Sequence, residues 1–440
     1  MTTTKNNEHK KLNVPNKQEQ NQTCLGSAER EGLSPKGNVP NLRFPEFQGE
    51  WEKCKLGNIA NVTGGYAFKS DTLNSIGGKY QVVKMGNLYQ NQLDLHRSPS
   101  YTNILTSKAE NVILRKGDIA ITLTGTNNKR DFGYTYIFND EKNLLLNQRC
   151  GLIRTKGDPY FLSCLLKTYA FLNQFFESAT GGTGNQANVS TKAMEMFYVN
   201  TPSLKEQKKI GVLMALLDER IATQNKIIDK LQSLIKGLND FLYTQYGGEV
   251  LTSFAELGTS YSGLSGKSAQ DFGSGKPFIT YLNVYSNNVI KENDLQYVAI
   301  KDDEKQNVVK YGDVLLTLSS ETPEEVGVGS VYLGKEKVYL NSFCFGIHIT
   351  NAEIAFPPYL SYYVSSTPFR KFVYPYAQGS TRFNLCKADF EKASIKLPTL
   401  ENQKRIYSIL SHIDNKIITE RQMLDLYNSQ KQYLLRQMFI

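Results

Sequence analysis

The decamer TPSLKEQKKI, Thr201–Ile210, recurs 196 residues later as LPTLENQKRI, Leu397–Ile406. Each copy has a proline near its start, followed by charged residues interspersed with Leu and Ile. Proline is favoured in the first turn of a helix, where its missing N–H costs nothing, so both copies predict the opening of a helix. The chain is therefore expected to contain two related helices far apart in the sequence.

Other segments repeat in the same order, at offsets between 194 and 199 residues. The segment TGNQANVSTK (183–192) matches GSTRFNLCKA (379–388), with Asn188 and Asn384 at the same position. The remaining pairs are KYQVVKMGNLYQN (79–91) with KPFITYLNVYSNN (276–288), KGDIAITLT (116–124) with YGDVLLTLS (311–319), LNQRCG (146–151) with LNSFCF (340–345), and PYFL (159–162) with PYLS (358–361). Such collinear matches indicate an internal repeat, in which one domain and one helix occur twice.

The segments between the repeated landmarks read mainly as strands, because aromatic and β-branched residues are bounded by Gly, Asn and Asp. One short helix is expected at Tyr160–Glu177. We therefore predict an α+β fold with two tandem mixed-β domains, each followed by a long α-helix. The expected divisions are a disordered N-terminal extension (1–42), a first domain (43–202), a central helix (203–247), a second domain (248–398) and a C-terminal helix (399–440).

Both long helices show apolar residues at heptad spacing over nearly five heptads, which is typical of a coiled coil. One polar residue, Gln224 or Glu420, interrupts the seam at the same place in each copy. The simplest pairing is antiparallel, of one helix with the other, although a surface helix packed on its own domain is an alternative. The predicted seam consists of Ile210, Met214, Leu217, Ile221, Gln224, Ile228, Leu231, Ile406, Leu410, Ile413, Ile417, Glu420 and Leu424. Such a rod would act as a spacer.

Composition limits the possible functions. The 440 residues carry a net charge of +9, which is compatible with an anionic partner such as nucleic acid. No apolar run is long enough for a membrane span, and the Lys/Asn/Gln-rich start has no apolar block of a secretory signal, so a cytoplasmic location is expected. The six cysteines form no C-x-x-C pair and the four histidines do not cluster, so no metal site is expected.

Two motifs resemble catalytic ones. GLSGKS, Gly263–Ser268, has Tyr261 where the first glycine of a P-loop would stand, so a plain loop is favoured. FGSG, Phe272–Gly275, and FPPY, Phe356–Tyr359, are similar to two motifs of amino-methyltransferases, but Phe356 offers no hydrogen-bond acceptor for an amino group. The sequence is therefore read as that of a recognition protein, with a single-chain DNA adenine methyltransferase as the enzymatic alternative.

A DNA-binding protein holds phosphates with Lys, Arg and main-chain amides, and reads base edges with Arg, Lys, Asn and Gln. The richest candidate loop lies between two predicted strands of the first domain, and equivalent loops occur in the second. The candidate contacts are Tyr66, Lys69, Thr124, Thr126, Asn127, Asn128, Lys129, Arg130, Asn185 and Gln186 in the first domain, and Lys267, Ser319, Ser320, Thr381 and Arg382 in the second. The basic-polar loop LTGTNNKRDFGY of the first domain is replaced by the acidic LSSETPEEVGVG in the second, which suggests that the two domains recognise different things.

Two variable domains, each followed by the helix opening Pro-x-Leu-x-x-Gln-Lys-x-Ile, resemble the specificity subunit of a type I restriction–modification system. The matching residues are Pro202, Leu204, Gln207, Lys208 and Ile210, and Pro398, Leu400, Gln403, Lys404 and Ile406. The segment WEKCKLGNIANVTGGYAFKS is also similar to that family. One departure is Asn402, which stands where the first copy has Glu206.

The resemblance implies that each domain is a target-recognition domain for one half of a bipartite, asymmetric site on double-stranded DNA. The helices would set the gap between the half-sites and bind two methyltransferase subunits, and two motor-nuclease subunits would join them. S-adenosylmethionine, ATP and Mg would be bound by those partners, and this chain would hold no cofactor and catalyse nothing. The non-enzymatic alternative is a coiled-coil scaffold that binds only proteins.

Overall fold

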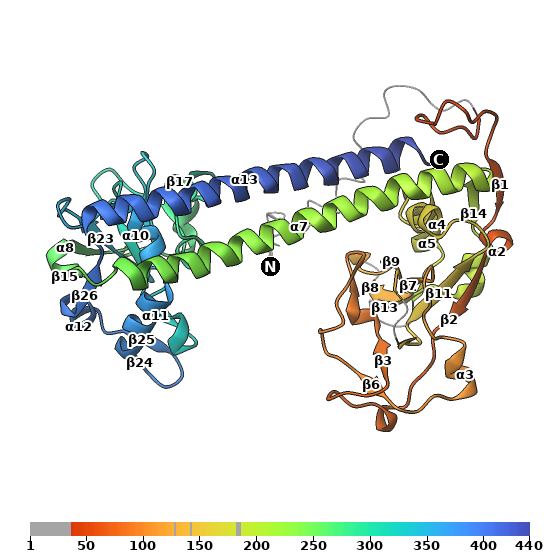
Figure 1. Ribbon diagram of the computed structural model, residues 1–440, viewed down its shortest axis with the longest axis horizontal. Coiled ribbons are helices and arrows are strands. Elements are labelled where there is room, and N and C mark those ends of the chain that lie inside the picture. The colour runs from red at the N-terminus through yellow and green to blue at the C-terminus, as the bar shows by residue number, and fades with distance from the viewer. Residues whose placement is uncertain (1–36, 127–128, 141–142, 182–185) are drawn as a thin grey trace, which may run out of the picture. The chain divides into compact units, whose positions relative to one another are not determined.

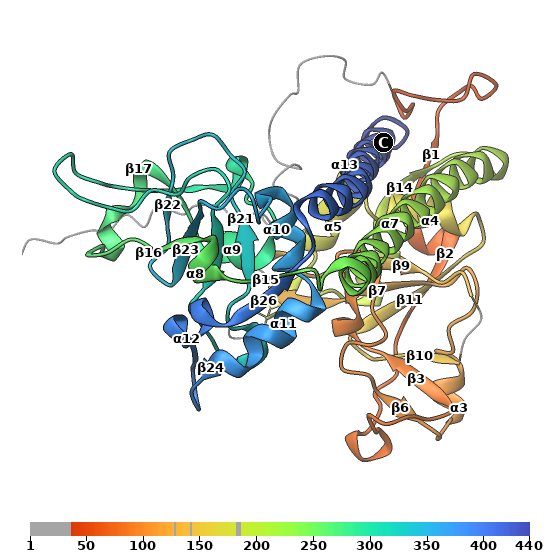
Figure 2. The same cartoon turned by 60° about the vertical axis from the view of Figure 1, so that its left-hand side comes forward.

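A computed structural model of the chain describes residues 37–126, 129–140, 143–181 and 186–440. The chain divides into two compact units, the first made of Met1–Ala222 and Asp425–Ile440 and the second of Thr223–Leu424. Each unit combines a globular domain with the start of one long helix and the end of the other (Figure 1, Figure 2). Within the described ranges, no helix is long and apolar enough to cross a membrane.

The first unit is built on small sheets, of which the central one has the strand order β2-β11-β7-β9 and is antiparallel throughout. A second sheet, β10-β3-β6, contains a parallel pair between β10 and β3. A third has the order β12-β13-β8, β1 pairs with β14, and β4 pairs with β5. The strands are β1 (Glu52–Lys55), β2 (Ala60–Gly64), β3 (Tyr80–Val83), β4 (Leu88–Tyr89), β5 (Gln92–Leu93), β6 (Tyr101–Thr102), β7 (Ile119–Thr122), β8 (Thr124–Thr126), β9 (Thr135–Ile137), β10 (Leu144–Leu146), β11 (Cys150–Thr155), β12 (Thr180–Gly181), β13 (Gln186–Asn188) and β14 (Tyr198–Thr201).

The second unit repeats this topology apart from the β4-β5 pair, which has no counterpart among the described residues there, and the repeat confirms the α+β architecture with two tandem mixed-β domains. Its sheets have the orders β16-β23-β19-β21, β18-β17-β22 and β20-β25-β24, and β15 pairs with β26. The parallel pair recurs as β17 with β22. The strands are β15 (Val250–Ser253), β16 (Gly258–Ser262), β17 (Phe272–Ile279), β18 (Gln296–Val298), β19 (Val314–Thr317), β20 (Ser319–Ser320), β21 (Gly329–Val331), β22 (Tyr339–Leu340), β23 (Cys344–Ile349), β24 (Ala377–Gln378), β25 (Phe383–Leu385) and β26 (Ser394–Leu397).

Four short α-helices recur at matching places of the two units, and each unit has one further short α-helix without a counterpart among the described residues. They are α2 (Leu56–Ile59), α3 (Ser107–Glu110), α4 (Pro159–Leu165), α5 (Tyr169–Glu177) and α6 (Thr191–Glu195) in the first unit, and α8 (Phe254–Leu257), α9 (Tyr281–Ser286), α10 (Pro357–Tyr363), α11 (Thr367–Val373) and α12 (Lys387–Lys392) in the second. The helices without a counterpart are α3 in the first unit and α9 in the second. The single helix expected at Tyr160–Glu177 is in fact two, α4 and α5. The chain breaks at Thr168, whose hydroxyl caps α5 by accepting a hydrogen bond from the Phe171 N–H.

The repeated decamers do open the two long helices, α7 (Leu204–Tyr246) and α13 (Leu400–Gln437). In each copy the motif glutamine ties this opening to its own domain. Gln207 donates hydrogen bonds to Thr201 Oγ1 and to the Pro202 carbonyl, both at 2.9 Å. Gln403 donates to the carbonyls of Pro398 (2.9 Å) and Ile354 (2.7 Å). Since both glutamines are buried, replacing either would leave main-chain groups unpaired.

In both units α7 and α13 pack against each other in opposite directions and form an antiparallel coiled coil (Figure 1). In the first unit Asp218 contacts Lys431, and Arg220 contacts Tyr427; in the second, Gln224 contacts Glu420. The numbers rise along one helix as they fall along the other, which defines the antiparallel pairing. All thirteen predicted seam residues are buried or half-buried.

Each unit has its own hydrophobic core, and the long helices contribute to both. In the first unit the core combines Ile210 and Met214 of α7 with Phe439, which follows α13. In the second it combines Leu242 of α7 with Ile406 and Leu410 of α13. The helices are therefore structural parts of the domains as well as partners of each other.

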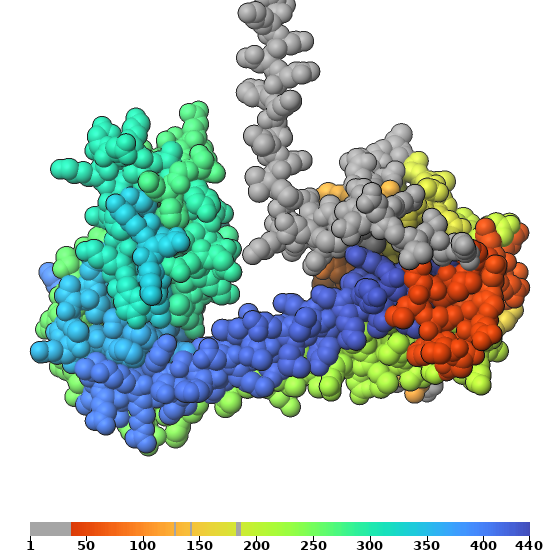
Figure 3. All heavy atoms as spheres, turned by 90° about the horizontal axis from the view of Figure 1, so that it is seen from above, coloured from red at the N-terminus to blue at the C-terminus, as the bar shows by residue number. Residues whose placement is uncertain are grey.

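Residues Asn38–Trp51, here called the N-terminal clasp, bind both long helices within the first unit. Arg43 forms a bidentate ion pair with Glu206 of α7 at 2.8 Å, and Trp51 Nε1 donates to the same carboxylate at 3.3 Å. The Leu42 N–H donates to the carbonyl of Gln437 at the end of α13 (2.8 Å). Figure 3 shows the dark blue end of α13 against the red clasp. Residues 38–42, assigned from the sequence to the extension, thus take part in packing.

Candidate nucleic-acid interface

The small sheet β12-β13-β8 brings together two candidate segments of the first domain that lie about sixty residues apart in the chain. In its register Thr124 pairs with Asn188, and Thr126 pairs with Gln186. Thr124 is buried and its hydroxyl donates to Asn188 Oδ1 at 3.1 Å, whereas the Gln186 side chain is exposed. Of these candidates, Gln186 is the one whose amide is positioned to contact an outside partner.

Lys129 and Arg130 are both exposed in the loop between β8 and β9. Arg130 has a left-handed backbone (φ +47°), and its guanidinium lies 5.1 Å from the centroid of the Phe176 ring. Stacking on an aromatic ring restricts the side chain and leaves its N–H donors available at the edges. The neighbouring candidates Asn127, Asn128 and Asn185 lie outside the described residues.

Tyr66 and Lys69 belong to a different part of the first unit. The Tyr66 main chain bridges to Asn147 beyond β10, and its ring packs edge-on against Phe68 at 4.9 Å between centroids. Lys69 precedes a short 3-10 turn and is exposed. The structure therefore places these two candidates beside the β10-β3-β6 sheet, with the other candidates in the β12-β13-β8 sheet.

In the second unit the corresponding sheet is β20-β25-β24, in which Ser319 pairs with Asn384, and Ser320 with Phe383. Ser319 and Ser320 are 6% and 9% exposed, and Ser320 Oγ donates to Glu325 at 2.8 Å, so the Ser320 hydroxyl serves an internal contact. Thr381 and Arg382 are exposed in the turn between β24 and β25. A two-stranded ribbon of this kind has the dimensions to enter a DNA major groove.

Arg382 repeats the arrangement of Arg130, since its guanidinium lies 5.7 Å from the Phe343 ring centroid. The same sheets also present exposed amides that the candidate list omitted: Asn188 in the first unit, and Gln378 and Asn384 in the second. Asn188 and Asn384 occupy the same position of the repeat, and that register was the available sequence signal. We add these three residues to the candidate interface.

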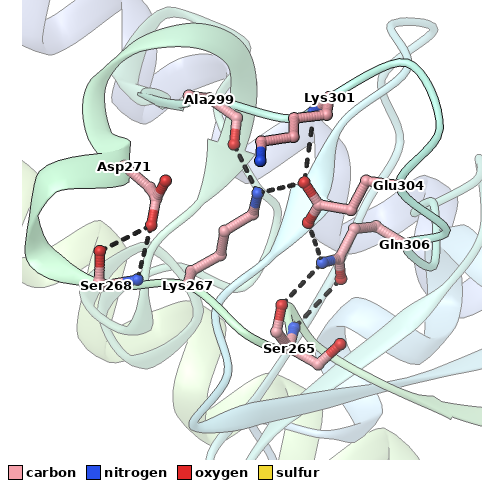
Figure 4. A network of polar contacts seen from close by, with 8 residues as sticks. All are labelled: Ser265, Lys267, Ser268, Asp271, Ala299, Lys301, Glu304 and Gln306. Atoms are coloured by element: carbon pink, nitrogen blue, oxygen red, sulfur yellow. Dashed lines mark hydrogen bonds and ion pairs between the residues drawn. The ribbon is translucent and has the colours of Figure 1, made fainter.

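Lys267, in contrast, is already paired within its own domain (Figure 4). Its ammonium contacts Glu304 Oε2 at 2.5 Å and donates to the Ala299 carbonyl at 2.6 Å. The lysine ammonium and the amide of Gln306 together lower the pKa of the Glu304 carboxyl to about 2. Lys267 and Glu304 therefore form an ion pair throughout the ordinary pH range.

The loop after β20 is acidic where the loop after β8 is basic. Glu321 and Glu324 are exposed, and Glu325 accepts hydrogen bonds from Tyr285 (2.6 Å) and Ser320 (2.8 Å). These bonds lower the pKa of the Glu325 carboxyl, so it stays charged. Carboxylates in a DNA-facing loop can accept hydrogen bonds from cytosine N4 but repel phosphates.

No group of three or more His, Cys, Asp or Glu side chains suited to a metal ion occurs among the described residues. The thiols of Cys150, Cys164 and Cys344 are buried and unbridged. Burial raises the pKa of Cys150 to about 12 and that of Cys164 to about 11, so both are held as thiols.

Comparison with known proteins agrees with this architecture. A family model, the type I restriction modification DNA specificity domain, matches residues 48–233 and 262–426. The chain is 29% identical over 180 residues to the type I restriction enzyme EcoAI specificity subunit of Escherichia coli, covering 40% of this chain and 29% of that protein. It is 24% identical over 401 residues to the type I restriction enzyme MjaVIII specificity subunit of Methanocaldococcus jannaschii, covering 86% and 89%.

A solved structure shares the whole fold. The crystal structure of a type I restriction–modification S subunit from M. genitalium superposes with a TM-score of 0.54 at 14% identity, covering 91% of this chain and 99% of that one. At that identity the likeness concerns the fold alone, whereas the family model matches well over half of the chain in two separate segments, one for each copy of the repeat. The chain therefore belongs to the type I restriction–modification DNA specificity family.

Proposed function

We propose that this chain is the DNA-recognition subunit of a type I restriction–modification complex, and that each of its two domains reads one half of a bipartite, asymmetric site on double-stranded DNA. The repeated topology carries this proposal. Four sheets recur in both units with the same strand order, and both units expose a small sheet edged by Gln, Asn and a ring-stacked Arg. The two domains share a scaffold, and their exposed loops differ in charge. This combination suits two DNA-binding domains that recognise different half-sites.

The coiled coil of α7 and α13 would set the distance between the half-sites. Both helices also expose apolar side chains outside the seam. In the second unit Ile227, Leu234 and Phe241 recur every seven residues along α7 and are 37%, 51% and 61% exposed. In the first unit Val212 and Leu216 are 58% and 59% exposed. These residues suit the docking of partner subunits, and we assign them to the two methyltransferase subunits.

The chemistry would reside in those partners. S-adenosylmethionine would be bound by the methyltransferase subunits, and ATP and Mg by two motor-nuclease subunits that join them. The motifs that suggested an enzymatic alternative have structural uses here: FGSG begins strand β17, and FPPY opens α10 with two prolines in its first turn. The Phe356 N–H donates to Gln403 Oε1 at 2.8 Å, so this segment fastens α13 to its domain.

The modular proposal is tested by exchanging residues 45–200 for those of a relative and sequencing the methylated sites. Only one half of the recognised site should change. A change in both halves, or in neither, would contradict one domain for each half-site. Binding of S-adenosylmethionine by the isolated chain would instead favour the enzyme, and lack of salt-dependent DNA binding even with methyltransferase partners would favour a protein-binding scaffold.

The spacer is tested by lengthening both helices together. Seven residues inserted after Gln224 in α7 and seven before Glu420 in α13 preserve the heptad register on both sides. Each insertion adds about 10 Å of helix. The unread gap should then grow by about three base pairs, at about 3.4 Å each. The same insertion in α7 alone is the control and should disrupt the pairing; an unchanged gap in the double insertion would refute the spacer.

A further inference from the structure

In the second domain Lys267 is covered and paired with Glu304, whereas the first domain has an exposed lysine, Lys69, at the corresponding place. Lys267 lies in the loop between β16 and β17, and its side chain is only 8% exposed because the segment Ala299–Gln306 covers it. We call this segment the acidic strap, since it contains Asp302, Asp303 and Glu304 in succession. Two of the ammonium's three donor positions are used, one by Glu304 and one by the Ala299 carbonyl (Figure 4).

The strap is fastened to the Lys267 loop by a closed set of hydrogen bonds. Glu304 Oε2 accepts from the Lys301 N–H (3.2 Å), and Glu304 Oε1 accepts from the Gln306 amide (2.5 Å). The Gln306 side chain in turn accepts from the Ser265 N–H (3.1 Å) and donates to the Ser265 carbonyl (2.8 Å). The strap therefore positions a carboxylate directly on the lysine.

The corresponding segment of the first domain has no acidic strap. The two domains align at Gly117 and Gly312, which share φ +87° and precede equivalent aspartates, Asp118 and Asp313, each accepting from a main-chain N–H three residues upstream. Counting back from these landmarks, the position of Glu304 corresponds to Ala109, a buried methyl group in α3, and Asp303 corresponds to Lys108. Lys69, the counterpart of Lys267, is exposed.

We propose that Glu304 occupies the position of a DNA backbone phosphate, so that Lys267 is a latent phosphate contact which the acidic strap masks until DNA displaces it. This inference rests on the proposed function. A carboxylate and a phosphate oxygen accept the same short, charge-assisted hydrogen bonds from an ammonium, so one can replace the other at little change in geometry. Glu304 itself is 23% exposed and borders solvent, into which it can swing.

The strap makes the two domains unequal in their attraction to DNA. The first domain presents Lys69 and Lys108 unmasked. In the second, Lys301 and Lys305 of the strap are exposed, but Lys267 can hold a phosphate only after Glu304 gives up its contact. Overall charge points the same way: residues 45–200 carry 17 basic and 13 acidic side chains, and residues 250–396 carry 14 and 15. The first domain therefore supplies more of the non-specific affinity, and the second engages only where its half-site supplies enough specific contact.

The test uses the full chain together with its methyltransferase partner on target duplex DNA. Glu304→Gln preserves the shape of the side chain and removes its charge, so it should tighten DNA binding about fivefold, which corresponds to roughly 1 kcal/mol. Asp303→Asn, at the exposed neighbouring acid, removes the same net charge and is the matched control with a smaller effect. Lys267→Ala should weaken binding and should cancel the gain of Glu304→Gln in the double variant.

A second measurement does not depend on DNA. Acetylation of surface amines, followed by peptide mass spectrometry, should label Lys69 about tenfold faster than Lys267 in the wild-type chain. Glu304→Gln should raise the labelling rate of Lys267 and leave that of Lys69 unchanged. Glu304→Asp, which keeps the charge but withdraws the carboxylate, should give an intermediate rate and provides a variant with a milder change to the fold.

The proposal is overturned if Glu304→Gln binds DNA no more tightly than Asp303→Asn, or if its gain persists without Lys267. It is also overturned if Lys267 is labelled as fast as Lys69 in the wild-type chain. Loss of salt-dependent binding in every variant, the wild type included, would instead reject the proposed function.

Discussion

The amide of Gln224 donates a hydrogen bond to the main-chain carbonyl of Glu420, 3.1 Å away, in the buried seam of α7 and α13. It also contacts the Glu420 carboxylate, which Lys416 holds from the other side at 2.5 Å. The two residues are 196 apart, the same offset that relates the helix openings. Equivalent positions of the repeat therefore face each other, and this buried polar pair marks the register of the antiparallel pairing.

Glu420→Leu should destabilise the second unit, because the buried Gln224 amide loses the carboxylate and keeps only the main-chain carbonyl of residue 420 as its partner. The double variant Gln224→Leu/Glu420→Leu should be at least as stable as the wild type and should raise Tm by about 2–4 °C, since a buried polar pair is replaced by apolar packing. Thermal unfolding of the three chains decides this. If the double variant falls below Glu420→Leu, the pair contributes stability as well as register.

The clasp offers a similar test at a buried ion pair. Glu206 is only 1% exposed, and its carboxylate is shared by Arg43 and Trp51. Arg43→Ala should destabilise the first unit by about 3 kcal/mol, because it leaves an uncompensated buried charge. Glu206→Gln in the Arg43→Ala background should recover most of this loss. Urea denaturation of the single and double variants measures both.

The second copy of the repeat shows why that rescue is expected. There the helix carries the neutral Asn402, and the acid is Glu249 on the segment before β15; Asn402 Nδ2 donates to Glu249 Oε2 at 3.0 Å. The hydrogen bond between segment and helix is kept with donor and acceptor exchanged, and it needs no arginine. If Glu206→Gln failed to rescue Arg43→Ala, the arginine would be required for packing of the clasp in addition to its charge.

Replacing either of two equivalent glycines, Gly117 or Gly312, by alanine should lower the free energy of unfolding, whereas the same change at Gly237 should raise it. Gly117 and Gly312 both have φ +87°, a conformation that costs an L-residue about 1–2 kcal/mol. Gly312→Ala should cost more than Gly117→Ala, because its Cβ would lie 3.0 Å from the Pro357 ring and that of Gly117 3.4 Å from Pro159. Gly237→Ala, in open space on α7, should stabilise by about 0.5–1 kcal/mol. Denaturant midpoints in a different order would contradict the positive φ angles of Gly117 and Gly312 on which the prediction rests.

The apolar stripe Ile227–Leu234–Phe241 should be required for partner docking. Leu234→Glu, on an exposed position of α7, should weaken co-purification of the methyltransferase subunit at least about tenfold, or ~1.4 kcal/mol. Gln232→Glu, which adds the same charge at another exposed position of α7, is the control and should bind normally. Equal loss in both variants would point to charge rather than to the apolar stripe, and circular dichroism would show whether α7 remains folded.

The sequence was most informative where local pattern determines structure. The decamers predicted both helix openings because the proline signal is local, although Pro202 and Pro398 lie two residues before the first residues of α7 and α13. The heptads predicted the coiled coil because their period is a property of the helix itself. The repeat predicted two equal domains without any knowledge of their sheets. The division of the expected helix at Tyr160–Glu177 was missed because the cap at Thr168 competes with an uninterrupted apolar pattern, and a propensity argument does not weigh that competition.

Contacts between residues far apart in the chain could not be predicted from the sequence. The partners Arg43 and Glu206 lie 163 residues apart, and Lys267 and Glu304 lie 37 apart, with no periodicity that connects them. The exposure of single side chains was not predictable either: Ser319 and Ser320 were proposed as DNA contacts and are buried, whereas Asn384 was not proposed and is exposed. Such features depend on which strands pair, and only the folded chain shows this.

The masked lysine also predicts a pH dependence. The Glu304 carboxyl has an ordinary pKa of 4.5, and its contacts with Lys267 and Gln306 lower the folded value to about 2. A carboxyl with a lowered folded pKa stabilises the protein above its ordinary value, and this contribution is lost as the pH falls from about 4.5 towards 2. The difference in unfolding free energy between wild type and Glu304→Gln should thus be constant above about pH 5.5 and shrink below pH 4.5. Asp303→Asn, with no such contact, should parallel the wild type. Denaturant unfolding of the three chains between pH 7 and pH 3 provides the measurement, and a difference independent of pH would show that Glu304 is not held by Lys267 in solution.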